Sequence, residues 1–169
     1  MESFAKFIVI ANSGKKSLDE TLGLINQGDI VAVLQELLKH EYLQKDVYET
    51  YQYLLLGPEG IAVSEHLDEH YDEETAHVRI LQRYLVALNA IPTLERFPIS
   101  KPDTNDLEGL MRLNHALEME AVERYSIVAK GLEGLNDSKH VALINDLQTI
   151  ASEETEHSQD LGRWLKENF

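Results

Sequence analysis

The placement of proline is the feature of this sequence that most constrains its fold. Three of the four prolines fall within residues 91–106, a segment that is also rich in Ser, Thr, Asp and Asn. Proline interrupts a helix because its ring clashes with the preceding turn and it has no backbone N–H to donate. We therefore expect a long non-helical connection here, with the rest of the chain free to form long helices.

Two shorter breaks divide the remaining sequence. They are Gly57–Gly60, which reads Gly-Pro-Glu-Gly, and Gly131–Asp137, which contains two glycines, Asn and Asp. Between the breaks, apolar residues recur with a period close to that of an α-helix and show no strand-like alternation. Asp106 is a plausible N-cap for the third long segment, and Asp137 or Ser138 for the fourth. The predicted helices are 29–56, 61–90, 107–132 and 138–168.

This pattern predicts an all-α fold, a four-helix bundle with a long crossover between its second and third helices. A connection of ~16 residues can extend over roughly 50 Å, and a helix of ~27 residues is about 40 Å long. The crossover can therefore run the full length of the bundle. We assign residues 1–28 to an N-terminal extension with a short helix over Ser17–Asn26 that ends near Gly28, and residues 29–169 to the bundle.

Composition excludes several classes of function. Thirty acidic and 15 basic side chains give a net charge of -15 with neutral histidine, so a basic face for nucleic acid is not expected. The chain has no cysteine, so any metal must be held by carboxylates and imidazoles. No segment is apolar enough to cross a membrane, and the apolar N-terminal run has no basic leader. We expect a soluble, cytoplasmic protein.

A repeated motif carries the chemistry. Residues 73–77 and 153–157 both read Glu-Glu-Thr-x-His. Within each, Glu and His are three positions apart, which places a carboxylate and an imidazole on the same helix face. Both side chains of each pair can therefore reach one metal ion. The repetition of a five-residue pattern in each half of the chain favours a functional origin over chance.

Hairpin geometry adds one glutamate to each pair. Glu41 and Glu74 lie on either side of Pro58 at almost the same distance along the chain, so an antiparallel hairpin brings them to the same height. Glu118 and Glu154 are equally distant from Asn136. Each hairpin thus contributes one Glu from its first helix and a Glu-x-x-His pair from its second.

The helical angle selects Glu118 over its acidic neighbours. At ~100° per residue, Glu118 lies about 50° from the centre of the apolar stripe, Glu120 more than 100° away and Glu123 almost opposite. The resulting set of four carboxylates and two imidazoles suits a dinuclear iron or manganese site inside a bundle. The predicted ligands are Glu41, Glu74, His77, Glu118, Glu154 and His157.

Several neighbouring residues are candidates for supporting roles. Tyr48 and Tyr125 each lie two helical turns after a ligand glutamate and should point into the bundle. Metal-bound histidines usually donate their second N–H to a carboxylate. We therefore hypothesise that Glu73 pairs with His157, and Glu153 with His77.

The other histidines have less specific settings. His66 and His70 share a helix face with Glu74, where they would line an ion route or serve surface or capping roles. His115 lies one turn before Glu118, as a neighbour of the site or a surface residue. We expect His40 and His140 at the surface.

Together these residues resemble the ferritin-like superfamily, and within it the bacterioferritin branch, over residues 34–164. The resemblance rests on Glu41, the two Glu-x-x-His pairs and the run from Ala116 to Val122 (Ala-Leu-Glu-Met-Glu-Ala-Val). The intervals between successive ligand glutamates are also similar to those of the family. The resemblance implies a ferroxidase centre in which the six ligands are also the catalytic residues. Such a centre oxidises Fe(II) with dioxygen or hydrogen peroxide, and a hollow shell of subunits stores the ferric product as mineral.

The sequence departs from bacterioferritins at three places. Thr75 occupies the position of the haem-ligating Met, so we expect no haem. The segment that follows His157, from Ser158 to Phe169, is too short to hold the fifth helix of the 24-subunit cage. The segment before the first long helix is longer than is usual in the family. The resemblance therefore implies two iron ions per subunit, with manganese as an alternative, and a homo-oligomer that is a dodecamer or smaller.

Other functions use the same ligand set. A rubrerythrin-type peroxidase, a manganese catalase and a dimetal hydroxylase are alternatives, although rubrerythrins usually carry a Cys-ligated iron domain that this chain cannot form. A metal-free structural bundle is disfavoured because six ligands at matched heights would then have no purpose. A DNA-protecting mini-ferritin is disfavoured because its DNA contacts need basic tails.

Overall fold

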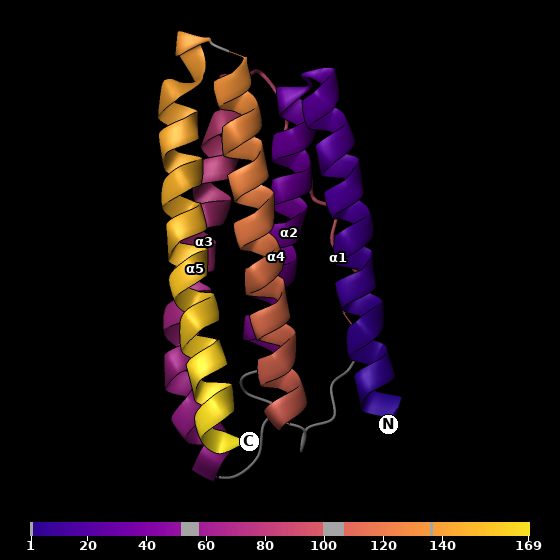
Figure 1. Ribbon diagram of the computed structural model, residues 1–169, viewed down its shortest axis with the longest axis vertical. Helices are drawn as coiled ribbons and strands as arrows, with labels where there is room; N and C mark the ends of the chain where they lie inside the picture. The colour runs from indigo at the N-terminus through magenta and orange to yellow at the C-terminus, as the bar shows by residue number, and fades with distance from the viewer. Residues whose placement is uncertain (1, 52–57, 100–106, 136) are drawn as a thin grey trace.

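A computed structural model describes residues 2–51, 58–99, 107–135 and 137–169, and in these ranges it contains helices and no strand. Four long helices form an elongated bundle, and a fifth lies along one side of it (Figure 1). The predicted all-α bundle is confirmed. No helix in the described ranges is both long and apolar enough to cross a membrane. The helices are α1 (Glu2–Gln27), α2 (Ile30–Tyr51), α3 (Pro58–Ala87), α4 (Leu107–Gly134) and α5 (Val141–Asn168), with a 3₁₀ turn, η2 (Ser138–His140), before α5.

The first helix is longer than the sequence suggested. We predicted a short helix from residue 17, whereas α1 spans 26 residues from Glu2. It ends as expected at Gly28, whose φ of 73° reverses the chain. The N–H of Asp29 bonds to the carbonyl of Leu24 at 3.1 Å, which satisfies a terminal carbonyl of the helix. The Asp29 side chain then accepts from the N–H of Ala32 at 3.0 Å and caps α2.

Other helix boundaries differ by a few residues from those predicted. α3 begins at Pro58, because proline is tolerated in a first turn where its missing N–H has no helical partner. It ends at Ala87, followed by Asn89 with a φ of 58°. Asp137 caps η2, not α5, by accepting from the N–H of Lys139. The proposed cap Asp106 and residues 52–56 of the first predicted helix lie outside the described residues.

The crossover is attached to α2 where the structure describes it, at residues 91–99. The Gln35 side chain donates to the carbonyl of Ile91 at 2.8 Å and accepts from the N–H of Thr93 at 2.7 Å. Further along, the Arg96 guanidinium stacks 3.3 Å from the ring centroid of Tyr42. The connection therefore runs beside α2, as expected for a crossover between α3 and α4.

The bundle buries two separate apolar clusters. Tyr42, Leu81, Tyr125 and Leu147 belong to the first, and Tyr48, Leu67, Leu117 and Leu161 to the second. Each cluster draws on all four helices of the bundle. Between them α2, α3, α4 and α5 place polar side chains in the core, which is where the predicted ligands lie.

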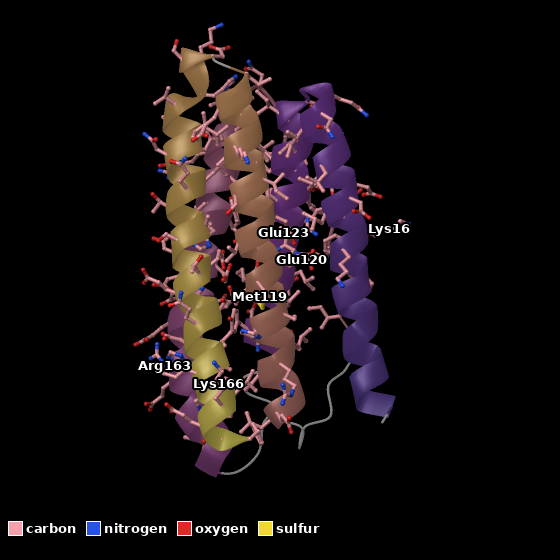
Figure 2. The ribbon with its side chains drawn as sticks, viewed as in Figure 1. Lys16, Met119, Glu120, Glu123, Arg163 and Lys166 are labelled. Atoms are coloured by element: carbon pink, nitrogen blue, oxygen red, sulfur yellow. The ribbon has the colours of Figure 1, made fainter. Side chains whose placement is uncertain are left out.

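A buried polar patch joins α1 to the bundle. Arg124 of α4 has no exposed surface and bonds through Nε to Glu120 at 3.0 Å. Figure 2 shows Glu120 on the side of α4 that faces α1. Nη1 of Arg124 also lies 3.5 Å from Ser17 of α1, whose hydroxyl donates to Glu36 of α2 at 2.7 Å. His40 lies beside this patch and is 1% exposed, so its predicted surface position is wrong. The reason is that α1 covers a side of α2 and α4 that a four-helix bundle alone would leave open.

Candidate metal centre

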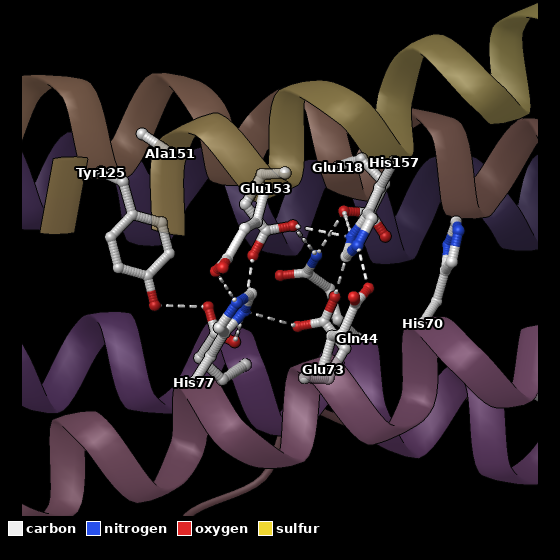
Figure 3. A network of polar contacts seen from close by, with 12 residues as sticks. Gln44, His70, Glu73, His77, Glu118, Tyr125, Ala151, Glu153 and His157 are labelled. Atoms are coloured by element: carbon white, nitrogen blue, oxygen red, sulfur yellow. Dashed lines mark hydrogen bonds and ion pairs between the residues drawn. The ribbon is translucent and has the colours of Figure 1, made fainter. Parts of the chain in front are cut away.

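The six predicted ligands meet in the polar layer between the two apolar clusters (Figure 3). Glu41, Glu74, Glu118 and Glu154 have no exposed surface, and His77 and His157 are 1% and 5% exposed. Glutamate side chains are almost never so deeply buried without partners. Each of the four bundle helices contributes at least one of the six.

One half of the site surrounds His77. Its Nδ1 lies 3.4 Å from Glu41 Oε2, 3.5 Å from Glu74 Oε2 and 3.0 Å from Glu154 Oε1. These four residues each offer a ligand atom within 4.8 Å of the others. The separations suit donors arranged around one ion.

The other half surrounds His157 in the same way. Its Nδ1 lies 3.5 Å from Glu118 Oε2, 3.7 Å from Glu74 Oε1 and 3.6 Å from Glu154 Oε2. Glu74 and Glu154 therefore turn one carboxylate oxygen toward each histidine. Glu41 and Glu118 each face a single half, so the geometry distinguishes two shared carboxylates from two terminal ones.

Several polar atoms that face the middle of the site have no hydrogen-bond partner. They are both oxygens of Glu74, one oxygen each of Glu41 and Glu154, and Nδ1 of both histidines. A buried polar atom without a partner destabilises a folded protein by about 1–3 kcal/mol. Cations placed between these donors would satisfy them, so the residues present fit a pair of metal ions.

Carboxylates outside the ligand set orient both histidines. Glu153 Oε2 lies 2.9 Å from His77 Nε2, and Glu73 Oε2 lies 2.6 Å from His157 Nε2. Both predicted contacts are confirmed. With Nε2–H donating outward, each ring would present the lone pair of Nδ1 to the centre once its Nδ1 proton is released, as a metal ligand requires.

Two buried tyrosines brace the terminal glutamates across the bundle. Tyr125 donates to Glu41 Oε1 at 2.5 Å, and Tyr48 donates to Glu118 Oε1. Tyr125 lies two turns after Glu118 on α4 yet bonds to Glu41 of α2. In the same way, Tyr48 lies two turns after Glu41 on α2 yet bonds to Glu118 of α4. The α2–α3 and α4–α5 hairpins therefore build the site as two similar halves, each held by a tyrosine of the other.

Comparison with known proteins establishes the family to which this chain belongs. The model of the ferritin-like domain family matches residues 31–168, the whole bundle without α1. This chain belongs to the ferritin-like domain family. No curated protein sequence matches it.

Two solved structures share the fold of this ferritin-like chain. One is a ferritin-like, diiron-carboxylate protein from Bacillus anthracis, with 19% identity and a TM-score of 0.72 over 88% of this chain and 97% of that one. The other is a dodecameric thioferritin from Bacteroides fragilis, described as a bacterioferritin-related protein. It has 20% identity and a TM-score of 0.71 over 88% of this chain and 94% of that one.

Gln44 is a site residue of the ferritin-like chain that sequence analysis missed. It has no exposed surface, and its Nε2 donates to Glu118 Oε2 at 3.1 Å and to Glu154 Oε2 at 3.3 Å. Because it follows Glu41 by three positions, it lies on the same face of α2. This spacing from Glu41 was the signal available in the sequence. A single glutamine at such a spacing does not distinguish a buried site residue from a surface residue.

The remaining histidines differ in their relation to the site. His70 is 3% exposed, and its ring stacks on His157 with centroids 4.2 Å apart. His66 is half-buried with its ring centroid 4.7 Å from that of His70. His115 is half-buried and belongs to none of the candidate metal groups among the described residues. His140 is also half-buried, and its Nε2 lies 3.7 Å from Asp137 at the turn before α5.

Burial and crowding shift the proton affinities of the ligands. Burial, and then repulsion from Glu154, raises the pKa of Glu118 to about 8. Burial and the neighbouring Glu74 raise the pKa of Glu41 well above its usual value. Burial would lower the pKa of His77 and His157, but their contacts with three glutamates each outweigh it and raise both. Burial and Glu74 oppose ionisation of Glu154, yet its contacts with Glu118 and both histidines leave its pKa lowered.

We expect the metal-free protein to become less stable as the pH rises from 6 to 9. Glu118, Glu41 and both histidines bind protons more tightly when folded than when unfolded, so their contribution to stability is lost as the pH rises through the folded pKa values, about 8 for Glu118. Glu154 contributes little in this window because its pKa is lowered. Metal ions must displace these protons, so the rise in melting temperature on metal addition should increase with pH. Thermal melts with and without metal across this range measure both trends, and a metal-free protein that melts higher at pH 9 would contradict the assignment.

Proposed function

We propose that this protein binds two iron ions per chain and oxidises Fe(II) with dioxygen or hydrogen peroxide, for iron storage or detoxification. The observation that carries the proposal is the overlap of two four-residue groups that share Glu74 and Glu154. Two ions held by shared carboxylates lie close enough to react with one oxidant molecule. Glu41 and His77 would complete one ion's ligands, and Glu118 and His157 those of the other.

The ligand types suit this chemistry. Carboxylate oxygens are hard donors that favour Fe(III) over Fe(II), so oxidation is downhill in such a site, and the imidazoles complete each coordination sphere. Two Fe(II) ions would supply two electrons, which together with two protons reduce dioxygen to hydrogen peroxide, or hydrogen peroxide to two water molecules. In the metal-free site, Glu41, Glu118 and the histidines hold protons that are released when metal binds.

Anaerobic titration with Fe(II), followed by exposure to air, tests the proposal. We expect two ions per chain and rapid appearance of Fe(III) without any added organic substrate. Stable binding of Mn(II) together with disproportionation of hydrogen peroxide would contradict it and indicate a manganese catalase. Oxidation that requires an organic co-substrate would indicate a hydroxylase or peroxidase.

For the assembly, we propose a closed homo-oligomer without haem, a dodecamer or a smaller ring. Soluble homo-oligomers are usually symmetric and closed, and the similar thioferritin from Bacteroides fragilis is dodecameric. We expect light scattering at neutral pH to give a mass near twelve times 19.2 kDa. A mass near twenty-four chains would contradict this proposal. A mass of one or two chains would rule out storage in a shell.

Haem binding is tested separately. Thr75 lacks a thioether, so protein expressed with ample haem should show no Soret band. Such a band would contradict the proposal that this protein is a non-haem member of its family.

A further inference from the structure

The two halves of the metal centre are equivalent in their ligands but not in their surroundings. Glu41 of α2 corresponds to Glu118 of α4, and the residue three positions further on is Gln44 in the first helix and Ala121 in the second. Glu74 of α3 corresponds to Glu154 of α5, and the residue four positions earlier is His70 in the first and Ile150 in the second. Two polar residues of the α2–α3 hairpin thus correspond to two apolar residues of the α4–α5 hairpin.

The centre therefore has one apolar end and one polar end. Ala121 and Ile150 are fully buried and belong to the same apolar cluster as Tyr125, which closes the end near His77. At the opposite end His70 continues the polar layer beyond His157, so Figure 3 shows Tyr125 and His70 on opposite sides of the ligands. Within the described residues, an additional imidazole adjoins the His157 half and not the His77 half.

His70 is close enough to share a cation with two of the predicted ligands. One atom each from His70, Glu118 and His157 lie within 4.8 Å of one another, and all three residues are buried. The hydroxyl of Tyr48 lies 3.1 Å from His70 Nδ1 and also contacts Glu118. The His70 ring stacks on His157 at an interplanar angle of 17°, and imidazole lone pairs lie in the ring plane, so one of the two rings must turn for both to bind the same cation.

We propose that His70, Glu118 and His157 form an additional position for a divalent transition-metal cation at the polar end of the centre. Two imidazoles and one carboxylate are ligands that such cations prefer. Glu118 and His157 also belong to the dinuclear set, so a cation at this position competes with the neighbouring ion of the pair. The position would hold a cation that is being loaded into the centre or released from it.

The surroundings of His70 connect this position to the outside of the bundle. The half-buried His66 lies one turn earlier on α3, and its ring is next to that of His70. A row of three imidazoles, those of His66, His70 and His157, therefore leads from a partly exposed position to the metal centre. In the part of the chain that the structure describes, the end closed by Ala121 and Ile150 has no comparable series.

Cobalt(II) titration of variants that lack the shared carboxylates tests the inference. Glu74→Ala combined with Glu154→Ala removes both bridging ligands, whereas His70, Glu118 and His157 remain. We expect this double variant to bind one cobalt ion per chain, seen in its visible absorption. Adding His70→Ile, which introduces the side chain found at the equivalent position 150, should weaken that binding at least tenfold. Adding His115→Ala instead removes a half-buried histidine that belongs to none of the candidate metal groups among the described residues, and it should change the affinity less than threefold.

The outcomes separate this inference from the proposed function on which it partly rests. Wild-type protein that binds two cobalt ions, with a double variant that binds none, would overturn the additional position and leave the dinuclear site standing. Equal effects of His70→Ile and His115→Ala would also overturn it. A double variant that binds one ion sensitive to His70→Ile, with wild-type protein that never holds a pair, would support the position and contradict the dinuclear site. Circular dichroism melts of every variant show whether the fold is retained.

Discussion

Replacing Glu74 or Glu154 with alanine is expected to reduce the rate of Fe(II) oxidation at least a hundredfold while the helical fold persists. Each carboxylate turns one oxygen toward His77 and the other toward His157. Loss of either one therefore removes a ligand from both ions at once, and the pair cannot form in reacting geometry. The variants can still hold a single cation. Stopped-flow absorbance of Fe(III) after mixing Fe(II) protein with aerated buffer measures the rate.

The stability of the metal-free protein should respond differently in the two variants. Without metal, Glu74 repels Glu41 and Glu154, so removing it relieves that repulsion and metal-free Glu74→Ala should melt no lower than the metal-free wild type. Glu154→Ala removes a carboxylate that both histidines contact, so the metal-free form of this variant should gain no stability. Glu123→Ala is the matched control, because this residue is exposed on α4 and should leave the oxidation rate unchanged. Wild-type rates in both Glu74→Ala and Glu154→Ala would refute the assignment of the centre.

The parts of this protein that follow a regular spacing could be predicted from its sequence. Glu-x-x-His fixes two side chains on one helix face, and the distance from each break fixes the height at which they meet in a hairpin. These two rules were enough to bring Glu41, Glu74, Glu118 and Glu154 together. The pairing of Glu73 and Glu153 with the histidines followed from the same geometry, because each immediately precedes its ligand glutamate.

The parts that depend on packing between distant helices could not be predicted. Gln44 and His70 have ordinary spacings on their own helices, and their positions gain meaning only when the equivalent Ala121 and Ile150 are known to be buried. His40 was placed at the surface because nothing in the sequence shows which side of α2 is covered by α1. Glu120 faces away from the metal centre, as its helical angle predicted, but it faces α1 and not solvent.

Arg124→Ala is expected to lower the free energy of unfolding by about 3–5 kcal/mol, since removing one partner of a buried ion pair leaves the other without compensation. Arg124 has no exposed surface and bonds to Glu120 on its own helix. It also approaches Ser17 of α1, which in turn bonds to Glu36 of α2. The substitution therefore leaves the largely buried Glu120 carboxylate without its cation, and it loosens the contact that holds α1 to the bundle.

Urea unfolding followed by circular dichroism measures this loss. Arg112→Ala is the matched control, because Arg112 forms the same i,i+4 pair on α4 with Glu108 but is about half exposed, and such pairs contribute about 0.3–0.5 kcal/mol. The loss in Arg124→Ala should be smaller at pH 5 than at pH 8. Burial raises the pKa of Glu120 despite the opposing effect of Arg124, so without the guanidinium this carboxyl can relieve its burial by binding a proton. A loss similar to that of Arg112→Ala would show that α1 is held by its apolar contacts and not by this polar patch.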